Sequence, residues 1–248
     1  MTFTRLLVPV LLFVIAPCTA AQVIVDSTSG RTITIKVVNP PPPPADTPLV
    51  REVRPGHPLL IELTRKSRRV VQDTIWLYSN IDAQNWPYHG EALDRSFESL
   101  FAPFYPGLTF PHEDPELFAT ARFVLDPQHV AYVLRVPGMY ESTALDLFIY
   151  DSRTMRFSPP ERLAESWGDE GCGFALEALL IRSSISRQVS WLTHKNTGCS
   201  DMETGKVLSN TDSLWIRRWS GSSFAAPQLG ADSALLGLFT HQWRRLRP

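Results

Sequence analysis

The sequence shows no excess of charge of either sign. Its 248 residues include 24 Lys and Arg against 25 Asp and Glu, and the formal net charge is −1. A balance this close to neutral excludes a polybasic nucleic-acid-binding protein. Hydrophobic residues make up 44% of the chain and charged residues 20%, which excludes an intrinsically disordered protein. The composition therefore predicts a folded globular protein with no nucleic-acid partner.

Long hydrophobic runs are absent after the N-terminal segment, which excludes a multi-span membrane protein. Residues 1–21 hold one cation, Arg5, followed by the apolar run Leu6–Ala16 and a small-residue end. This order is typical of a secretory signal peptide that is cleaved after Ala20 or Ala21. We therefore expect an exported protein in the periplasm, on the cell surface or outside the cell, with no membrane span in the mature chain.

Two alternatives stay open for the same N-terminal segment. A retained membrane anchor is disfavoured because the run contains Pro9 and is shorter than the roughly 20 residues that cross a bilayer. Lipid attachment at Cys18 is disfavoured because Pro17, which precedes it, matches a lipoprotein cleavage box poorly.

Cysteine is scarce, with three residues in the chain, and one of them, Cys18, lies in the predicted signal peptide. The other two, Cys172 and Cys199, are not part of a CxxC motif or of a nucleophile-like sequence. In an oxidising compartment such a pair is expected to form a disulfide, the alternative being a reactive thiol. Closing the loop between them contributes roughly 3–4 kcal/mol in the chain-entropy account.

Recognisable catalytic motifs are also absent. The sequence contains no GxSxG, HExxH, GxGxxG or phosphate-binding P-loop pattern. Its six histidines are scattered without the spacing of metal ligands, and the densest acidic cluster, His112–Glu116, fits a helix start at Pro115. We therefore predict no catalytic residue, no metal site and no cofactor, and the sequence favours a protein that is not an enzyme.

The chain divides into four predicted parts. After the signal peptide, residues 22–39 read as a β-hairpin arm, because Arg31–Val38 alternates polar and apolar residues and Gly30 supplies a turn. Residues 40–45 contain five consecutive prolines and predict a stiff linker. Residues 46–248 are expected to form one domain.

Strand patterns dominate that domain. The segments Leu59–Thr64 and Thr74–Ser79 flank a basic turn and predict a hairpin. Six further strands are expected at Arg122–Leu125, Val130–Val136, Ala144–Tyr150, Ala178–Ser183, Val189–His194 and Ser213–Trp219. The predicted fold is all-β, with antiparallel propeller-like or sandwich sheets and a few short peripheral helices.

Three segments carry helical signals. Apolar residues recur at helical spacing over Leu93–Phe101, and Asp114 followed by Pro115 resembles a capped helix start. A C-terminal helix is expected from Asp232 with Leu235, Phe239, Trp243 and Leu246 on one face, although a strand from Leu235 to Trp243 is an alternative.

A similar sequence pattern occurs in two segments that are 67 residues apart. Leu147–Pro160 and Leu214–Pro227 each read as an apolar strand, a polar turn, an aromatic residue and proline. With Trp167–Gly171 and the strand Ala178–Arg182, the stretch from about 123 to 227 resembles exported bacterial proteins with FG-GAP or VCBS-type repeats, which form propeller blades around an acidic calcium loop. The corresponding segment here, Arg182–Ser190, has no carboxylate, and calcium requires six to eight oxygen ligands. The resemblance therefore implies a blade without its metal.

Two short segments are candidates for ligand binding. Trp86, Tyr88 and His89 form an aromatic and polar loop of the kind that contacts glycans, and Asp169 and Glu170 lie in a glycine-flanked turn. We expect an exported, non-enzymatic binding or interaction protein with a protein or glycan ligand. Two alternatives are a secreted hydrolase that acts on glycan or cell-wall material through a carboxylate pair, and a structural envelope component.

Overall fold

The computed structural model describes most of the predicted domain and the two strands of the arm. The described residues are 22–25, 32–35, 52–80, 85–105, 115–139, 143–183, 185–229 and 235–239. The predicted signal peptide (1–21) and linker (40–45) lie outside the described residues.

The fold is mostly β, which confirms the predicted class at that level. Within the described residues, 12 strands form one mixed sheet whose central order is β14-β13-β12-β11-β10-β8-β7-β6-β3, and this order does not close on itself. The strands are β3 (Arg68–Arg69), β4 (Thr74–Leu77), β5 (Glu91–Ala92), β6 (Phe118–Val124), β7 (His129–Val136), β8 (Ala144–Asp151), β9 (Arg156–Phe157), β10 (Glu161–Asp169), β11 (Cys172–Arg182), β12 (Val189–Ser200), β13 (Val207–Arg218) and β14 (Gln228–Leu229).

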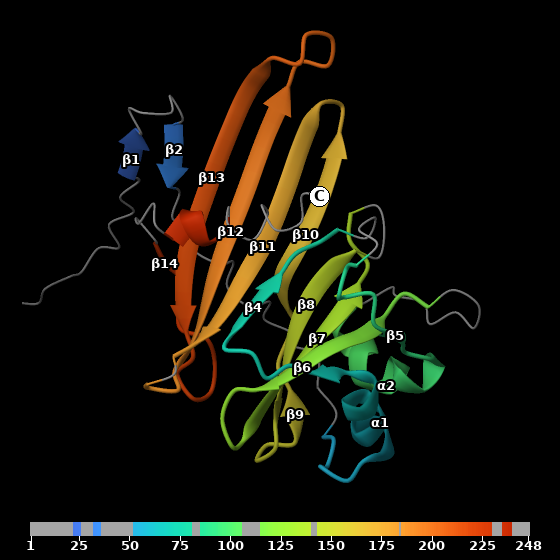
Figure 1. Cartoon of the computed structure of the whole chain (residues 1–248). Helices are drawn as coiled ribbons and strands as arrows, with labels where there is room; N and C mark the ends of the chain where they lie inside the picture. The colour runs from blue at the N-terminus through green and yellow to red at the C-terminus, as the bar shows by residue number, and fades with distance from the viewer. Residues whose placement is uncertain are drawn as a thin grey trace, which may run out of the picture.

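Strand β10 divides this sheet into two halves. Its first residues pair with β8, its last residues pair with β11, and the register shifts between Arg162 and Ala164. Such an irregularity bends a strand, so that β10 runs from one half into the other. We call β3 and β5–β9 the short-strand half, and β4 and β11–β14 with the end of β10 the long-strand half. In Figure 1 the long strands β10–β13 rise as two hairpins well past the rest of the body.

The main hydrophobic core lies between the two halves. It combines Val133 and Leu147 of the short-strand half with Leu180 and Trp191 of the long-strand half. These four side chains are at most 3% exposed. Burying an aliphatic side chain of the size of Val or Leu contributes about 2 kcal/mol. The shared core is therefore what holds the two halves together.

A second core lies on the other face of the short-strand half. Phe148 and Tyr132 of the sheet pack there against Leu63 of α1 (Pro58–Lys66) and Phe101 of α2 (Glu98–Phe101). Short 3-10 turns, η1 (Arg95–Phe97) and η2 (Ala102–Phe104), flank α2. This helical segment confirms the helix predicted over Leu93–Phe101.

A third, smaller cluster covers the outer face of the long-strand half. Leu179, Leu192 and Leu214 pack there with Phe239, which belongs to a helical turn at Leu235–Phe239. The predicted C-terminal helix is thus present over these residues, and its remaining positions lie outside the described residues. Figure 1 shows this turn in front of β12 and β13.

Two sequence predictions for local structure are wrong. Leu59–Thr64 belongs to helix α1 and not to a strand, because Pro58 sits in the first turn and the His57 side chain accepts a hydrogen bond from the Leu59 amide (3.2 Å). The expected helix after Pro115 does not form either, since the chain is irregular until β6 begins at Phe118. The predicted strand Thr74–Ser79 is present as β4, but it pairs with β11, so the predicted hairpin with Leu59–Thr64 does not form. The six other predicted strands are present as β6, β7, β8, β11, β12 and β13.

The two strands of the arm form a sheet of their own. β1 (Gln22–Val25) pairs antiparallel with β2 (Thr32–Ile35), in agreement with the predicted hairpin. Strand β2 lies against β13 without joining its ladder (Figure 1).

Candidate functional site

Two of the predicted binding residues belong to the main core. Trp86 is 2% and Tyr88 3% exposed. The Trp86 indole donates to the Tyr78 carbonyl (2.9 Å), and the Tyr88 hydroxyl donates to the Trp76 carbonyl. Burial also raises the pKa of Tyr88, so its hydroxyl stays a donor. Both rings therefore pack the loop after β4 onto the sheet.

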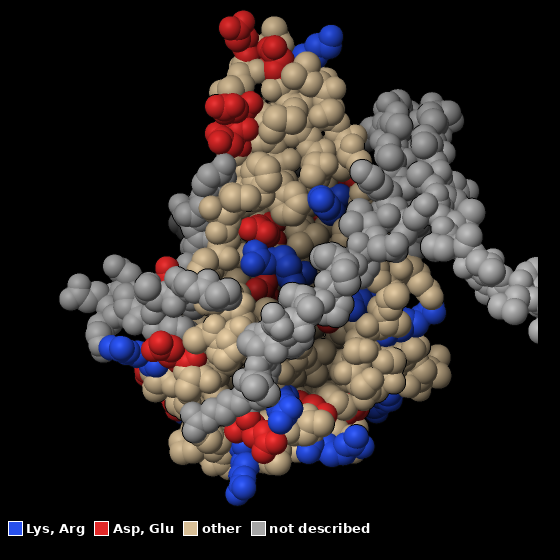
Figure 2. Space-filling view, turned by 180° about the vertical axis from the view of Figure 1, so that it is seen from behind, with Lys and Arg blue, Asp and Glu red and all other residues tan. Residues whose placement is uncertain are grey.

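The other three predicted residues are exposed and lie in different places. His89 packs edge-on against Trp86, with ring centres 5.3 Å apart, and its carbonyl accepts from Arg135. Asp169 and Glu170 lie at the turn between β10 and β11. Figure 2 shows acidic residues at the tips of the projecting hairpins. The structure thus does not gather the five predicted residues into one site.

The predicted disulfide between Cys172 and Cys199 is present. The two residues are direct cross-strand partners on β11 and β12, with Cα atoms 3.9 Å apart. Because successive residues of a strand alternate between faces, the bridge marks one face of the projecting hairpins. We call this the inner face, since it continues into the main core.

The strand register arranges the inner face in rows that run across the long strands. From the row of the disulfide toward the body, the next rows are Trp167–Phe174–Thr197–Thr211, Glu165–Leu176–Lys195–Ser213, Ala178–Thr193–Trp215 and Leu180–Trp191–Arg217. The first two rows and Trp215 are half-buried, whereas Ala178, Leu180, Trp191 and Thr193 are buried. The exposed end of the face therefore combines aromatic rings with hydroxyl and charged groups.

Aromatic contacts order the tip end of this face. The rings of Trp167 and Phe174 are stacked, with centres 5.6 Å apart and planes at 15°. The ammonium group of Lys195 lies 5.4 Å from the centre of the Phe174 ring. Cation–π contact of this kind holds a lysine over an aromatic surface. The three side chains come from three neighbouring strands and form one continuous surface.

Ion pairs lie where the long strands meet the body. Arg217 pairs with Glu161 and stands 4.9 Å over the Trp191 ring. Arg162 contacts Asp146 (2.5 Å) and Glu165 (2.9 Å). Figure 2 shows acidic and basic side chains together in a hollow below the projecting hairpins.

The carboxylate of Asp146 is bound from two sides. It is 3% exposed and accepts from Arg162 and from the Tyr105 hydroxyl (2.7 Å). Burial, together with the Asp146 charge, raises the pKa of Tyr105. Since Glu161, Glu165 and Asp146 are all engaged by arginines, this group is built for charge compensation and not for an acid–base pair facing a substrate.

Two buried polar atoms on the inner face are unsatisfied. Neither the Trp191 indole nitrogen nor the Thr193 hydroxyl has a hydrogen-bond partner among the described residues. Trp191 is 3% and Thr193 2% exposed. Buried groups of this kind are rare because each one loses the hydrogen bonds that it makes in water.

A half-buried histidine lies on the opposite, outer face. His194 Nδ1 is 2.8 Å from Glu177 Oε1, and its Nε2 is 2.9 Å from Asp212 Oδ1. Burial alone lowers the pKa of His194, but the hydrogen bonds and charges of Asp212 and Glu177 outweigh it and raise the pKa to about 9. Both ring nitrogens are occupied, so the histidine joins three strands and is not available as a general base.

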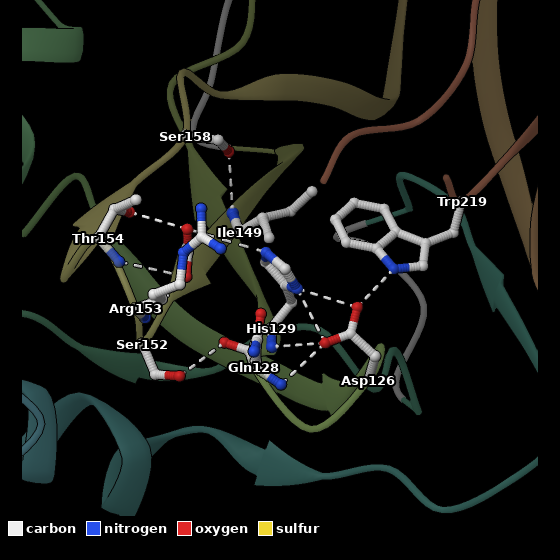
Figure 3. A network of polar contacts seen from close by, with 10 residues as sticks. Asp126, Gln128, His129, Ile149, Ser152, Arg153, Thr154, Ser158 and Trp219 are labelled. Carbon is white, nitrogen blue, oxygen red and sulfur yellow. Dashed lines mark hydrogen bonds and ion pairs between the residues drawn. The ribbon is translucent and has the colours of Figure 1, made fainter. Parts of the chain in front are cut away.

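A second polar network surrounds His129, the first residue of β7 (Figure 3). Asp126 contacts His129 Nδ1 (2.8 Å) and accepts from the Trp219 indole (2.8 Å), whereas His129 Nε2 is 3.9 Å from Asp151. Burial raises the pKa of Asp126, but hydrogen bonds from Trp219, the Gln128 amide and His129 lower it overall.

This network also holds the turns of the chain. Asp126 accepts from the Gln128 and His129 amides, and Asp151 accepts from the Arg153 and Thr154 amides. The nearby Ser152 hydroxyl donates to a backbone carbonyl and not to the histidine. The network therefore locks the β6–β7 and β8–β9 turns to Trp219 and does not assemble a nucleophile with its base.

A surface cavity of about 500 Å³ lies on the helical side, lined by Arg95, Ser96, Glu98, Ser99, Ala102 and Pro103. Its carboxylate, Glu98, stands 3.6 Å from Arg95. This cavity does not bring two carboxylates together. Across the described ranges, no cluster of His, Cys, Asp and Glu suits a metal ion.

The inner face was not predicted as a site from the sequence. Trp215 stands in a predicted strand, whereas Lys195 and Thr197 follow the predicted strand Val189–His194. Only the register across four strands places them on one face with Trp167 and Phe174. The available signal was the alternation of polar and aromatic residues at every second position of adjacent strands.

Helices capable of crossing a membrane are not found in the part of the chain that the structure describes.

Comparison with known proteins found no matching family model, no matching curated protein and no matching solved structure. The resemblance to FG-GAP and VCBS-type repeats stays a prediction.

Proposed function

We propose that the protein is an exported, non-enzymatic carbohydrate-binding protein whose ligand lies on the inner face of β10–β13. The observation that carries this proposal is the half-buried surface of Trp167, Phe174, Thr197, Lys195 and Trp215 on four neighbouring strands. Aromatic rings pack against the C–H faces of sugars, and hydroxyl and ammonium groups bond to sugar oxygens. A flat sheet face that projects from the body suits an extended chain of sugars.

Export is supported by the N-terminal signal pattern and by the disulfide. A cross-strand bridge near the tips of the projecting hairpins is stable in an oxidising compartment. The binding face and the bridge share the same strands, so the bridge stabilises the surface that meets the ligand.

The ion pairs of the carboxylates near the inner face favour a binding protein over a hydrolase. A glycosidase needs two carboxylates facing one sugar bond across roughly 5–10 Å. Near the inner face, Glu161, Glu165 and Asp146 are instead paired with Arg217 or Arg162.

The same proposal includes the finer fold type. We assign the two halves of the sheet to a two-layer sandwich, because one core draws side chains from both halves. The two similar segments, Leu147–Pro160 and Leu214–Pro227, are short hairpins whose aromatic residues, Phe157 and Phe224, enter different cores.

Affinity electrophoresis tests the function. Residues 22–248 with the disulfide formed would be run through gels that contain neutral and acidic polysaccharides, and we expect at least one of them to retard the protein. Trp215→Ala should weaken this binding about tenfold through the lost ring contact. Ile61→Ala, a change at a 57% exposed residue of α1, is the matched control and should leave retardation unchanged.

Two results would contradict the proposal. One is the absence of retardation by every polysaccharide, and the other is equal retardation of the wild type and the folded Trp215→Ala variant. Release of new reducing ends from a retained polysaccharide would instead support the hydrolase.

A further inference from the structure

Strand β12 presents three consecutive residues of one face, Trp191, Thr193 and Lys195, toward the inner face. They occupy alternate positions of the strand, so their side chains share a direction and are about 7 Å apart along it. Trp191 lies at the buried end of this series and Lys195 at the half-buried end. The series therefore runs from the core out to the proposed sugar-binding surface.

Two of these residues have unused hydrogen-bonding capacity. The Thr193 hydroxyl and the Trp191 indole nitrogen have no partner among the described residues, although both side chains are at least 97% buried. A threonine hydroxyl on a strand has a short reach, so the register fixes its position between Ala178 on β11 and Trp215 on β13. An unsatisfied hydroxyl beside the aromatic edge of a binding face is a feature that a ligand can satisfy.

The third residue is a cation without a counter-ion. Lys195 makes no ion pair with any residue that the structure describes, and its ammonium group lies over the Phe174 ring. The two arginines near the foot of the same face, Arg162 and Arg217, are both paired with carboxylates. Arg182, on the same face of β11, donates to the Val124 carbonyl at the body end of the strand. At the half-buried end of the face, Lys195 is thus the positive charge that is left for a ligand.

The three groups share one chemical property. An indole N–H and an ammonium group only donate hydrogen bonds, and a hydroxyl also donates. A matching ligand group must therefore supply acceptor oxygens, and a negative charge on it would compensate Lys195. Glu165 in the same row is already paired with Arg162, so the one unpaired cation, Lys195, suits a single negative charge on the ligand.

We propose that the inner face recognises an acidic sugar, with the sugar carboxylate bound at Lys195 and Thr193. This inference rests on the proposed carbohydrate-binding function and names the class of sugar, a uronic acid. The carboxylate accepts from the Lys195 ammonium group, and it accepts from the buried Thr193 hydroxyl once the side chains that cover this hydroxyl shift aside. The ring of the sugar packs on the aromatic surface of Trp215.

The test compares two forms of one glycan. A short galacturonate oligomer and its fully methyl-esterified form would be titrated calorimetrically into residues 22–248 with the disulfide formed. We expect the acid form to bind about tenfold more tightly than the ester, the effect of one charge-assisted contact. In Lys195→Met this preference should disappear, whereas Lys206→Met, a change of an exposed lysine at the hairpin tip, should keep it.

The substitution Thr193→Val distinguishes a ligand-binding role of Thr193 from a purely structural one. This isosteric change removes a buried hydroxyl that has no partner, so we expect a higher melting temperature than that of the wild type. The same variant should bind the acid form about threefold more weakly. Stabilisation combined with weaker binding is a result that a merely structural threonine would not produce.

Three outcomes would overturn the inference. They are equal affinity for acid and ester, a preference for the acid that survives in Lys195→Met, and tighter binding of a sulfated glycan of the same length than of galacturonate. In each of these cases, binding of a neutral or sulfated glycan to the same face would still support the proposed carbohydrate-binding function. Failure of every polysaccharide to bind would instead refute the proposed function itself.

Discussion

His194 joins three strands through charge. Its two ring nitrogens contact Glu177 on β11 and Asp212 on β13, and Asp212 also accepts from the Asn196 side chain (2.7 Å). The Trp76 indole donates to the second oxygen of Glu177 (2.7 Å). Because the imidazole is protonated in the folded state, the site holds one positive charge between two negative charges in a region covered by Phe239.

This residue predicts a pH dependence of stability. The folded pKa of about 9 is above the ordinary 6.5, so the stabilisation is fully present below pH 6.5 and is lost as the pH rises through about 9. The difference corresponds to roughly 3 kcal/mol in the free energy of unfolding. Denaturant unfolding followed by tryptophan fluorescence should show this decline in the wild type and not in His194→Gln. In the control His89→Gln, a change at an exposed histidine, stability should fall with pH as it does in the wild type. If stability in His194→Gln falls with pH as steeply as in the wild type, the assignment is refuted.

Single residues also show which side-chain environments could not be predicted from the sequence. The aromatic character of Trp86 and Tyr88 suggested a ligand contact, but their positions after β4 direct both rings into the core. Thr193 lies in the predicted strand Val189–His194 and Lys195 just after it, and neither suggested a site, because their shared surface exists only after β11, β12 and β13 are in register. Composition and alternation identify strands, whereas the neighbours of a side chain depend on pairings far apart in sequence.

The hairpins β10–β11 and β12–β13 are the elements that extend past the packed body. Their tip ends carry the proposed binding face in place of a full core, and the Cys172–Cys199 bridge joins the two middle strands there. The pairing of these cysteines could be predicted from their number and context alone, since two cysteines have one intramolecular partner each.

Removing the bridge should loosen the tips and reduce stability. The cysteines are 27 positions apart, and opening a loop of this size costs about 3 kcal/mol in the chain-entropy account. We therefore expect the Cys172→Ser/Cys199→Ser double variant to unfold at lower denaturant concentration and to be cleaved first near the β12–β13 turn. Limited proteolysis with mass spectrometry, alongside equilibrium unfolding, measures both effects. Equal stability and an unchanged cleavage pattern would contradict this role.

Helix α1 shows why a short apolar run is ambiguous. Leu59–Thr64 fits a strand by composition, but Leu60 and Leu63 are the buried residues of the element and are three positions apart, the spacing of one helical face. Glu62 pairs with Arg65 (2.6 Å), a contact that helical spacing creates. Pro58 was the local signal for the helix start, and giving it more weight would have corrected the prediction.

At the scale of the whole molecule, the long-strand half has two different faces. Its outer face carries the His194 network and the cluster under Phe239, while its inner face passes from the main core to the proposed binding surface. The class of fold could be predicted from strand patterns. The switch of β10 between the two halves could not, because it depends on the register shift between Arg162 and Ala164 and on β4 taking the remaining edge of β11.

Tryptophan signals offer the most direct test, because the six tryptophans among the described residues sample both faces and the core. In ¹H–¹⁵N spectra assigned through single Trp→Phe variants, a short galacturonate oligomer would be titrated into residues 22–248. The account predicts that the indole signals of Trp167 and Trp215 on the inner face shift with added ligand, while those of Trp86 in the core and Trp76 on the outer face do not. Shifts confined to Trp76 or Trp86, or no shift of any indole with all polysaccharides tried, would contradict binding at the inner face.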